Sequence, residues 1–303
     1  SRWRAPGETL VRGECVVVAA TRSSGNETGR EGEREGRQRE WGWGMRAQAV
    51  QLREGASGDP VLRLDLAGLR PGAEYRFVHR ADLIALLLNG AREAGVELRL
   101  LQRIEAVDLA GLRPKLRTAA GDTISTDLLI GADGLHSKVR AALNGLVAPT
   151  FTGQVAWRAT IPCEGPTDAV AEVHMGPGRH LVSYPLRGGA MRNIVAVEER
   201  KRWAEESWSL RDDPMEMRLA FAEFSPRVRR WLDAVPDVGL WGLFRHPVAR
   251  VWQEGGRVAI LGDAAHPTLP FLAQGANLAL EDAWVLAASL AGHEAPAAGL
   301  AAY

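Results

Sequence analysis

Residues 257–284 constrain the fold more than any other stretch, because they join a short apolar run, a loop of small residues and a second apolar run with helical spacing. The first run, residues 257–261, is long enough for one buried strand, and Gly262 and Pro267 mark the break after it. At such a corner, unpaired N–H groups and the positive end of the helix dipole face the loop. The stretch predicts an anion or dinucleotide site, with Asp263 placed to accept hydrogen bonds from a sugar hydroxyl. The alternative is an ordinary corner in which Asp263 is a turn residue.

Residues 128–140 repeat this order of features. An apolar run at 128–130 leads into Gly131-Ala132-Asp133-Gly134, and Ser137 suits the start of a helix as its cap. Small residues let the backbone approach a ligand, which a helix N-terminus then faces. Residues 128–140 therefore predict a second corner that suits the same kind of ligand.

Both corners resemble the flavin fingerprints of one family. Residues 262–283, GDAAHPTLPFLAQGANLALEDA, resemble the second flavin fingerprint of the class A flavoprotein aromatic hydroxylases, a group that includes salicylate and p-hydroxybenzoate hydroxylases. Residues 131–140, GADGLHSKVR, resemble the family's other fingerprint, and VHRADL at 78–83 resembles a segment whose arginine contacts FAD. The family often has Gly at the position of Ala273, which is a mild departure.

The resemblance implies a set of cofactor-binding residues. Asp263, after Gly262, would bind the ribityl chain of FAD, and Arg80 would lie near the ribityl and pyrophosphate groups. Asp133 and Gly134 would lie on the pyrophosphate side. The segments expected against the isoalloxazine ring are Pro270 and the loop Gln274, Gly275, Ala276 and Asn277.

The expected organisation is a Rossmann-like FAD-binding domain of the aromatic hydroxylase type, an α/β (α+β mixed) fold whose first βαβ unit is missing or degenerate, with an inserted β-sheet substrate domain. Its parts are an atypical segment 1–46, a first cofactor-binding part 47–150, a substrate sheet 151–247, and a second cofactor-binding part 248–303 that begins a C-terminal helix.

The first 46 residues contain little that predicts a packed structure. Only residues 14–20 could form a strand, and 23–44 hold no aliphatic residue, so they are expected to be mostly disordered or loosely attached. The string at 42–47 formally fits G-x-G-x-x-A, but no strand precedes it, and we reject it as a phosphate loop. A fragment, or a chain translated from a wrong start, is one hypothesis for this region.

Alternation and turn residues predict the remaining elements. A helix with apolar positions from Leu83 should end at Gly95 and be followed by a strand at 96–101. Helical spacing returns at 211–233. The other predicted strands are a hairpin at 48–53 and 61–66, short strands within 107–130, and four strands at 154–161, 169–174, 180–185 and 193–198.

Composition excludes several classes of function. Lys+Arg and Asp+Glu are both 37, so no overall field favours nucleic acid or an anionic membrane. The two cysteines, Cys15 and Cys163, lack the spacing of a metal site. No apolar run reaches the length of a membrane span, and no signal peptide is visible. We therefore expect a cytoplasmic protein without a metal.

The resemblance implies an NADH- or NADPH-dependent monooxygenase that uses FAD and molecular oxygen to hydroxylate a small aromatic substrate, with a homodimer as a conceivable assembly. Weak catalytic candidates are His180, Tyr184 and His266. A solvent-facing or core role is the stronger interpretation of the first two, whereas His266 could equally face the flavin or cap its loop. The alternatives are an FAD-dependent dehydrogenase or epoxidase, and a truncated homologue that binds FAD weakly or not at all.

Overall fold

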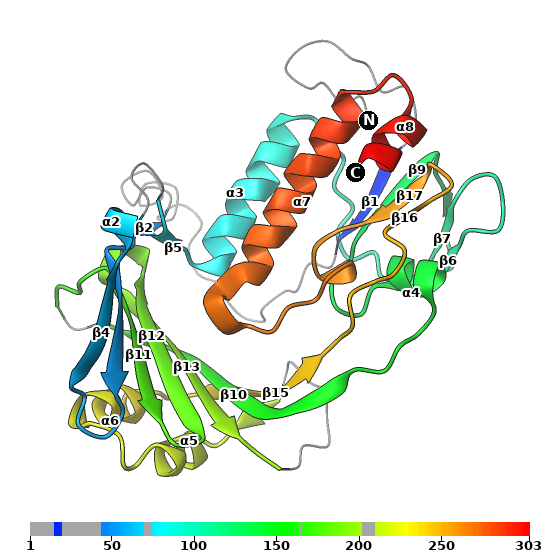
Figure 1. Ribbon diagram of the computed structural model, residues 1–303. Coiled ribbons are helices and arrows are strands. Elements are labelled where there is room, and N and C mark those ends of the chain that lie inside the picture. Colours follow the sequence, from blue (N-terminus) through cyan, green and yellow to red (C-terminus); the bar gives the residue numbers. More distant parts are fainter. Residues whose placement is uncertain (1–14, 20–43, 70–73, 164, 202–209) are drawn as a thin grey trace. The chain divides into compact units, whose positions relative to one another are not determined.

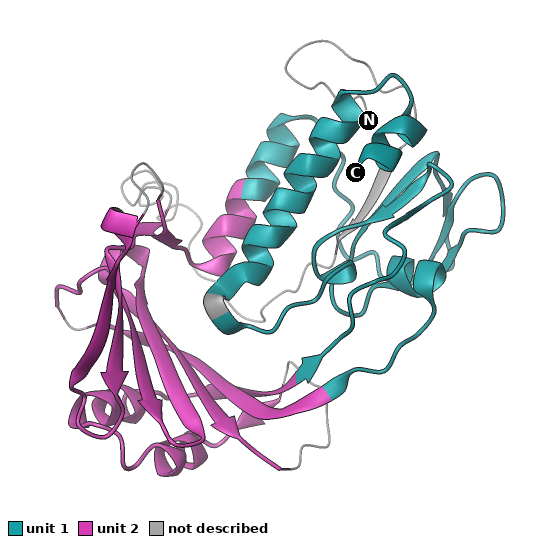
Figure 2. Cartoon of the chain, viewed as in Figure 1, with its two compact units in different colours: residues 1–25, 87–150, 244–303 teal, residues 26–86, 151–243 magenta. Residues whose placement is uncertain are grey.

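The computed structural model describes residues 15–19, 44–69, 74–163, 165–201 and 210–303. Within it the chain divides into two compact units (Figure 2), and each is described by itself. The first unit comprises residues 1–25, 87–150 and 244–303, and the second comprises residues 26–86 and 151–243.

A four-stranded sheet organises the first unit (Figure 1), in the order β1-β9-β17-β16. The strands β1 (Cys15–Ala19), β9 (Leu128–Ala132) and β17 (Val258–Ile260) are parallel, and β16 (Gln253–Glu254) is antiparallel to β17. The carboxyl ends of these parallel strands lie at one edge of the sheet. In open α/β sheets, ligands bind at that edge.

Both faces of this sheet are covered, which explains why β9 and β17 are apolar throughout. Leu128 and Ile130 pack toward α7 (Gln274–Ala291) and α8 (Pro296–Ala302). Leu129, on the alternate face, belongs to the core that includes Val139 of α4. The remaining elements here are α4 (Lys138–Asn144) and the three-stranded sheet β6 (Ile104–Asp108), β7 (Lys115–Thr118) and β8 (Thr123–Ser125).

The second unit is built on an eight-stranded sheet in the order β14-β15-β10-β13-β12-β11-β3-β4. Helices α5 (Pro214–Ala220) and α6 (Pro226–Asp233) cover one face, where Trp157, Leu181 and Ile194 form the core with Phe221 and Leu232. The strands are β3 (Ala49–Glu54), β4 (Pro60–Asp65), β10 (Thr150–Pro162), β11 (Val170–Gly176), β12 (Arg179–Leu186), β13 (Met191–Glu199), β14 (Arg211–Asp212) and β15 (Val238–Arg245). The short elements β2 (Met45–Arg46), α2 (Leu66–Leu69) and β5 (Arg76–Phe77) precede α3 (Arg80–Glu93).

A buried carboxylate ties α6 to this sheet. Glu172 is 5% exposed and accepts hydrogen bonds from Arg227 at 2.5 Å and from Arg53 at 3.0 Å, and His174 lies 3.3 Å from it. Burial alone would raise the pKa of Glu172, but the His174 hydrogen bond and the two arginines outweigh it and lower that pKa to about 2. The carboxylate is thus held ionised in the folded protein.

The structure confirms the predicted hairpin, the four strands of the middle region, the helix that ends before Gly95 and the strand within 14–20. The prediction of a strand at 96–101 is wrong: the chain turns at Leu100–Leu101, and Leu101 has a φ of 60°, which an extended strand cannot accommodate. The helical region at 211–233 begins with β14 and is split into α5 and α6, because Pro226 starts a new helix.

The predicted disorder of residues 23–44 falls almost entirely outside the described residues. Met45 and Arg46 form strand β2, paired with β5, so the string at 42–47 does not open a helix. In the described part of the chain, no helix has the length and hydropathy needed to cross a bilayer.

Candidate functional site

The two glycine-containing corners lie side by side at the carboxyl edge of the parallel sheet. Ile260 is the register partner of Gly131, and the Leu261 N–H donates to the Gly131 carbonyl at 3.0 Å. Asp133 follows β9 directly, and Asp263 follows β17 after two residues. Arg140 of α4 also bridges the corners, since it donates to the Ala264 carbonyl at 3.4 Å. The two stretches are therefore neighbours in the fold, and that they build one cofactor site stays a prediction.

Asp263 lies beside the start of α7. It is exposed and occupies the 3₁₀ turn Gly262–Ala264, which Gly262 enters with a φ of 59°. A Cβ on Gly275 would stand 3.9 Å from Asp263 Oδ1 and 2.8 Å from Thr268 Oγ1. The absence of a side chain at Gly275 therefore keeps the space around the Asp263 carboxylate open.

Helix α7 begins without a side-chain cap. Pro270 precedes the 3₁₀ turn Phe271–Ala273, and Ala273 makes no capping hydrogen bond. The N–H groups of Gly275 and Ala276 lie in the first helical turn, where an α-helix offers no internal partner, and Asn277 follows them directly. These donors and the helix dipole suit an acceptor-rich ligand.

Ala273 has left-handed backbone angles, φ 51° and ψ 33°. A residue with a Cβ pays about 1–2 kcal/mol for that conformation, whereas glycine does not. This explains physically why Gly is frequent here in the family that the sequence resembles. The backbone strain at Ala273 therefore lies in the turn that leads directly into α7.

Asp133 shapes its own corner. Its carboxylate accepts hydrogen bonds from the N–H groups of Lys138 at 2.7 Å and Val139 at 3.3 Å, and from the Ser137 hydroxyl. The Ser137 hydroxyl in turn accepts from the Arg140 N–H at 2.8 Å, which confirms Ser137 as the cap of α4. Gly134, with a φ of 76°, makes the turn between them.

His266 contacts Asp282, a residue that the sequence analysis did not select for the site. Its Nε2 lies 2.5 Å from Oδ2 of Asp282 on α7, and the same oxygen accepts the Gly262 N–H at 2.7 Å. The Trp252 ring lies 5.1 Å from the His266 ring between centroids. The only sequence signal for this contact is an acidic residue two turns into the predicted helix.

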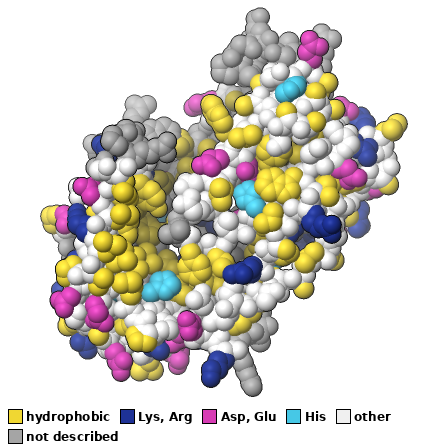
Figure 3. Space-filling model, viewed as in Figure 1, with side chains coloured by type: hydrophobic (Ala, Val, Ile, Leu, Met, Phe, Trp, Pro, Cys, Tyr) yellow, Lys and Arg dark blue, Asp and Glu magenta, His cyan; other side chains and the backbone are white. Residues whose placement is uncertain are grey.

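In the second unit, the sheet face opposite α5 and α6 carries Tyr184. Its ring stacks on Phe77 at 5.3 Å. Burial raises the pKa of Tyr184, against the opposing charge of Arg158. His180, on the same strand, is half-buried, and burial lowers its pKa. Figure 3 shows hydrophobic side chains gathered over part of this unit.

One row of side chains across this face includes the guanidinium of Arg158. Arg158 stands over the Trp241 ring at 4.8 Å, and within the described residues its buried Nε has no hydrogen-bond partner. Burial lowers the pKa of Arg158; Tyr184 opposes this, and the charge of Arg80 adds to it. The register-matched row is Leu62, Leu52, Val173, Val182, Val195 and Arg158.

Arg80 lies at the N-terminus of α3, is exposed and belongs to the second unit. The first turn of α3 is anchored by Asp82, which accepts from Arg187 Nε at 3.1 Å and from its terminal nitrogen at 2.9 Å. Arg187 also approaches His79 at 3.4 Å.

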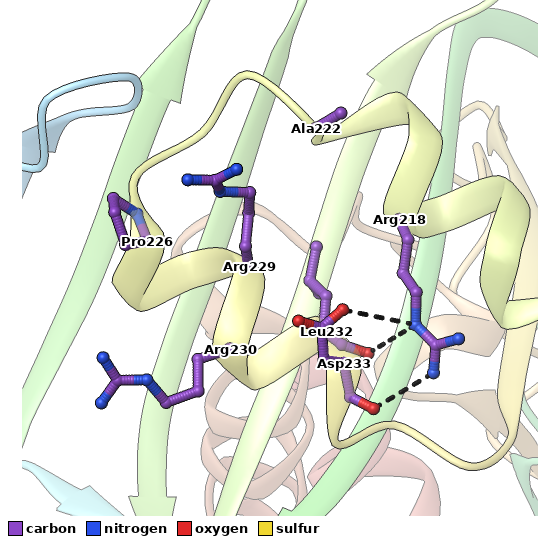
Figure 4. A pocket seen from close by; sticks show the side chains of 7 residues that line it. All are labelled: Arg218, Ala222, Pro226, Arg229, Arg230, Leu232 and Asp233. Carbon is purple, nitrogen blue, oxygen red and sulfur yellow. Dashed lines mark hydrogen bonds and ion pairs between the residues drawn. The ribbon is translucent and has the colours of Figure 1, made fainter.

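A concavity between α5 and α6 is not part of this site (Figure 4). It is lined by residues of α5, of α6 and of the loop between them, including Arg218, Arg229 and Arg230. Arg218 is fully engaged with the C-terminus of α6, since it donates to the carbonyls of Leu232, Asp233 and Val235. This arrangement fastens the two helices together.

The residues of the first unit fit the flavin that the resemblance implies. An exposed carboxylate suits the hydroxyls of a ribityl chain. An uncapped helix start suits the oxygen and nitrogen acceptors of a flavin ring. Gly275 leaves space beside both groups. The described residues show no His, Cys, Asp and Glu cluster that could hold a metal ion.

Comparison with known proteins agrees with this fit. 3-Amino-4-hydroxybenzoate 2-monooxygenase of Streptomyces cremeus is 36% identical over 259 residues, which cover 82% of this chain and 62% of that enzyme. The chain thus spans less than two thirds of the length of this curated relative.

Solved structures share the fold. CtdE in complex with FAD and a substrate superposes with a TM-score of 0.75 at 22% identity, over 86% of this chain and 68% of that one. A salicylate hydroxylase substrate complex gives a TM-score of 0.66 at 26% identity, over 82% and 65%. The expected resemblance to the aromatic hydroxylases is confirmed. Residues 24–303 match the family described as FAD binding domain, and the chain belongs to that family.

Proposed function

We propose that this protein is a flavin-dependent monooxygenase that hydroxylates a phenolic or aromatic-acid substrate with NADH or NADPH and molecular oxygen. The observation that carries the proposal is the meeting of two glycine-containing corners at one sheet edge, with Asp263 beside an uncapped helix start. The similarity to 3-amino-4-hydroxybenzoate 2-monooxygenase supports the choice of reaction.

The chain's own residues bind and orient the cofactor. FAD, when bound, supplies the redox chemistry that activates oxygen. Asp263 would accept hydrogen bonds from the ribityl hydroxyls, and Pro270 with Gln274, Gly275, Ala276 and Asn277 would hold the ring. Gly262 lets the turn approach α7, and Gly134 and Asp133, which builds the start of α4, shape the pyrophosphate side. Arg80 would add positive charge near the phosphates.

The open sheet face of the second unit would bind the substrate. Its apolar row suits a planar ring. Arg158, whose buried Nε has no hydrogen-bond partner among the residues that the structure describes, suits a carboxylate or phenolate. Tyr184 could donate a hydrogen bond to the same substrate, because burial keeps its hydroxyl protonated. His180 lies on the same face of β12, four residues before Tyr184, and is the candidate for proton transfer.

Substrate turnover tests the proposal. The purified chain with FAD would be assayed for NADH and NADPH oxidation and oxygen uptake with salicylate, 3-amino-4-hydroxybenzoate and neutral phenols. The proposal predicts substrate-stimulated oxygen uptake and a product that carries one oxygen atom from labelled oxygen gas. Reduction of the cofactor with no labelled product would instead favour a dehydrogenase; a labelled epoxide would favour an epoxidase.

We propose a cytoplasmic protein without nucleic-acid or membrane partners, supported by the balance of 37 basic and 37 acidic residues. A homodimer is proposed from the family resemblance, and light scattering would measure it. The division into cofactor-binding parts 47–150 and 248–303, a substrate part 151–247 and a preceding segment 1–46 belongs to the same proposal, which limited proteolysis would test.

A further inference from the structure

We propose that Asp282, together with His266, is a positioning residue for the cofactor: it locks the turn that carries Asp263 to the helix whose first turn receives the flavin ring. The inference rests on FAD occupying the corner described above, as the proposed function does. It assigns to His266 a role through Asp282 in place of contact with the substrate.

The geometry centres on one carboxylate oxygen. Asp282 Oδ2 accepts the Gly262 N–H at 2.7 Å and lies 2.5 Å from His266 Nε2. Gly262 opens the 3₁₀ turn, and His266 closes it, since its N–H donates to the Gly262 carbonyl at 2.9 Å. Asp263 therefore lies between the two groups that Asp282 holds.

Asp282 can transmit this position because it belongs to α7 itself. It lies two turns after Gly275, on the helix that begins with the predicted ring-binding residues. Gly262 also packs directly on α7, where a Cβ would come 3.0 Å from the Cβ of Ala279. A rigid helix thus fixes the separation between the Asp263 turn and the first turn of α7.

The surroundings favour a strong and well-oriented contact. The side chains of His266 and Asp282 are 15% and 16% exposed. Trp252 packs on the His266 ring, and its own indole N–H donates to the Ala249 carbonyl at 2.9 Å. A hydrogen bond to an ionised group with little water around it is stronger than one at the surface. The His266 ring is therefore held by Trp252 and by Asp282, and its Nε2 already contacts the Asp282 carboxylate.

The test compares Asp282→Ala, Asp282→Asn and His266→Ala with a matched control, Glu281→Ala, which removes the neighbouring exposed carboxylate of the same helix. The measured quantities are the FAD dissociation constant, the visible absorbance and circular dichroism of the bound flavin, and the melting temperature of the FAD-free protein. A purely structural role would move the last and leave the first two unchanged.

We expect Asp282→Ala to raise the dissociation constant at least about tenfold and to change the flavin spectrum, because the turn and the helix no longer keep one separation. Asn offers one oxygen at the same place, so Asp282→Asn should recover most of the affinity. His266→Ala removes one of the two partners and should weaken binding about threefold. Glu281→Ala should stay within about twofold of the unaltered chain.

Several results would overturn the inference. One is a folded Asp282→Ala protein with the affinity and spectrum of the Glu281→Ala control. If Asp282→Ala does not fold, an unchanged spectrum and affinity in His266→Ala overturns it. An unaltered chain that does not bind FAD overturns both this inference and the proposed function. A chain that binds FAD but hydroxylates nothing overturns the proposed function alone, and the affinities still decide the role of Asp282.

Discussion

Replacing Asp263 by Ala should weaken FAD binding strongly while leaving the fold intact. The turn keeps its own backbone bonds, in which the N–H groups of Ala265 and His266 both donate to the Gly262 carbonyl at 2.9 Å. The exposed carboxylate, by contrast, stands beside Gly275 where a ribityl hydroxyl would donate to it. The backbone bonds of the turn do not use this carboxylate, so the substitution removes an acceptor for the ligand while those bonds stay in place.

The size of the effect follows from the charge of the acceptor. A hydrogen bond to a charged group is worth about 1.5–3 kcal/mol, and about 1.4 kcal/mol is a factor of ten in the dissociation constant. Asp263→Ala should thus raise the FAD dissociation constant about 10- to 150-fold, and Asp263→Asn, which keeps a neutral acceptor, should lie in the lower part of that range.

Titration of the FAD-free protein, followed by quenching of flavin fluorescence, measures these constants directly. His266→Ala serves as the comparison, because the His266 side chain contacts Asp282, which in turn accepts the Gly262 N–H. An Asp263→Ala protein within twofold of the unaltered chain would refute the reasoning. So would equal losses in Asp263→Ala and His266→Ala, since the carboxylate would then have no role of its own.

Three further predictions test the second unit and the sheet of the first. Arg158→Met should raise KM for aromatic acids at least about tenfold while changing KM for neutral phenols little, as steady-state oxygen uptake would show; equal changes would speak against an anion contact. The pKa of Glu172 is lowered on folding from 4.5 to about 2, so its stabilisation is present above pH 4.5 and is lost as the pH falls toward 2. The advantage of the unaltered chain over Glu172→Gln in urea unfolding, up to about 3 kcal/mol, should shrink over that window, and a constant difference would contradict the assignment. Gly131→Ala should destabilise by about 1–3 kcal/mol, because its Cβ would come 2.6 Å from that of Val139. The control Gly90→Ala meets nothing within 4 Å on α3 and should raise the melting temperature slightly; a Gly131→Ala protein that melts no lower than this control would count against the packing.

Local patterns in the sequence were enough to place the corners of the site. The apolar run before Gly131, the small residues after Ile260 and the spacing of α7 each follow from short-range rules, and the structure has them. Ser137 could be recognised as a cap from its place before a helical run. The resemblance added what spacing could not, namely that both corners serve a flavin.

Contacts between distant residues were not predictable in the same way. Asp282 lies 20 residues beyond Gly262, and only the packing of α7 brings its carboxylate to that N–H. The alternating pattern of residues 154–161 gives no reason to single out Arg158. Its importance comes from the sheet register, which places it beside Val195 in an otherwise apolar row. The strand predicted at 96–101 is absent, because a strand also needs a neighbouring strand to pair with, and a local pattern does not show whether one is present.

The most direct measurement is a calorimetric titration of the purified chain with FAD, read together with its visible spectrum. We expect one FAD bound per chain, with the absorbance bands of a protein-held flavin. A folded, colourless protein that gives no heat of binding and retains no flavin on titration would contradict the claim that the two adjacent sheet corners build a cofactor site.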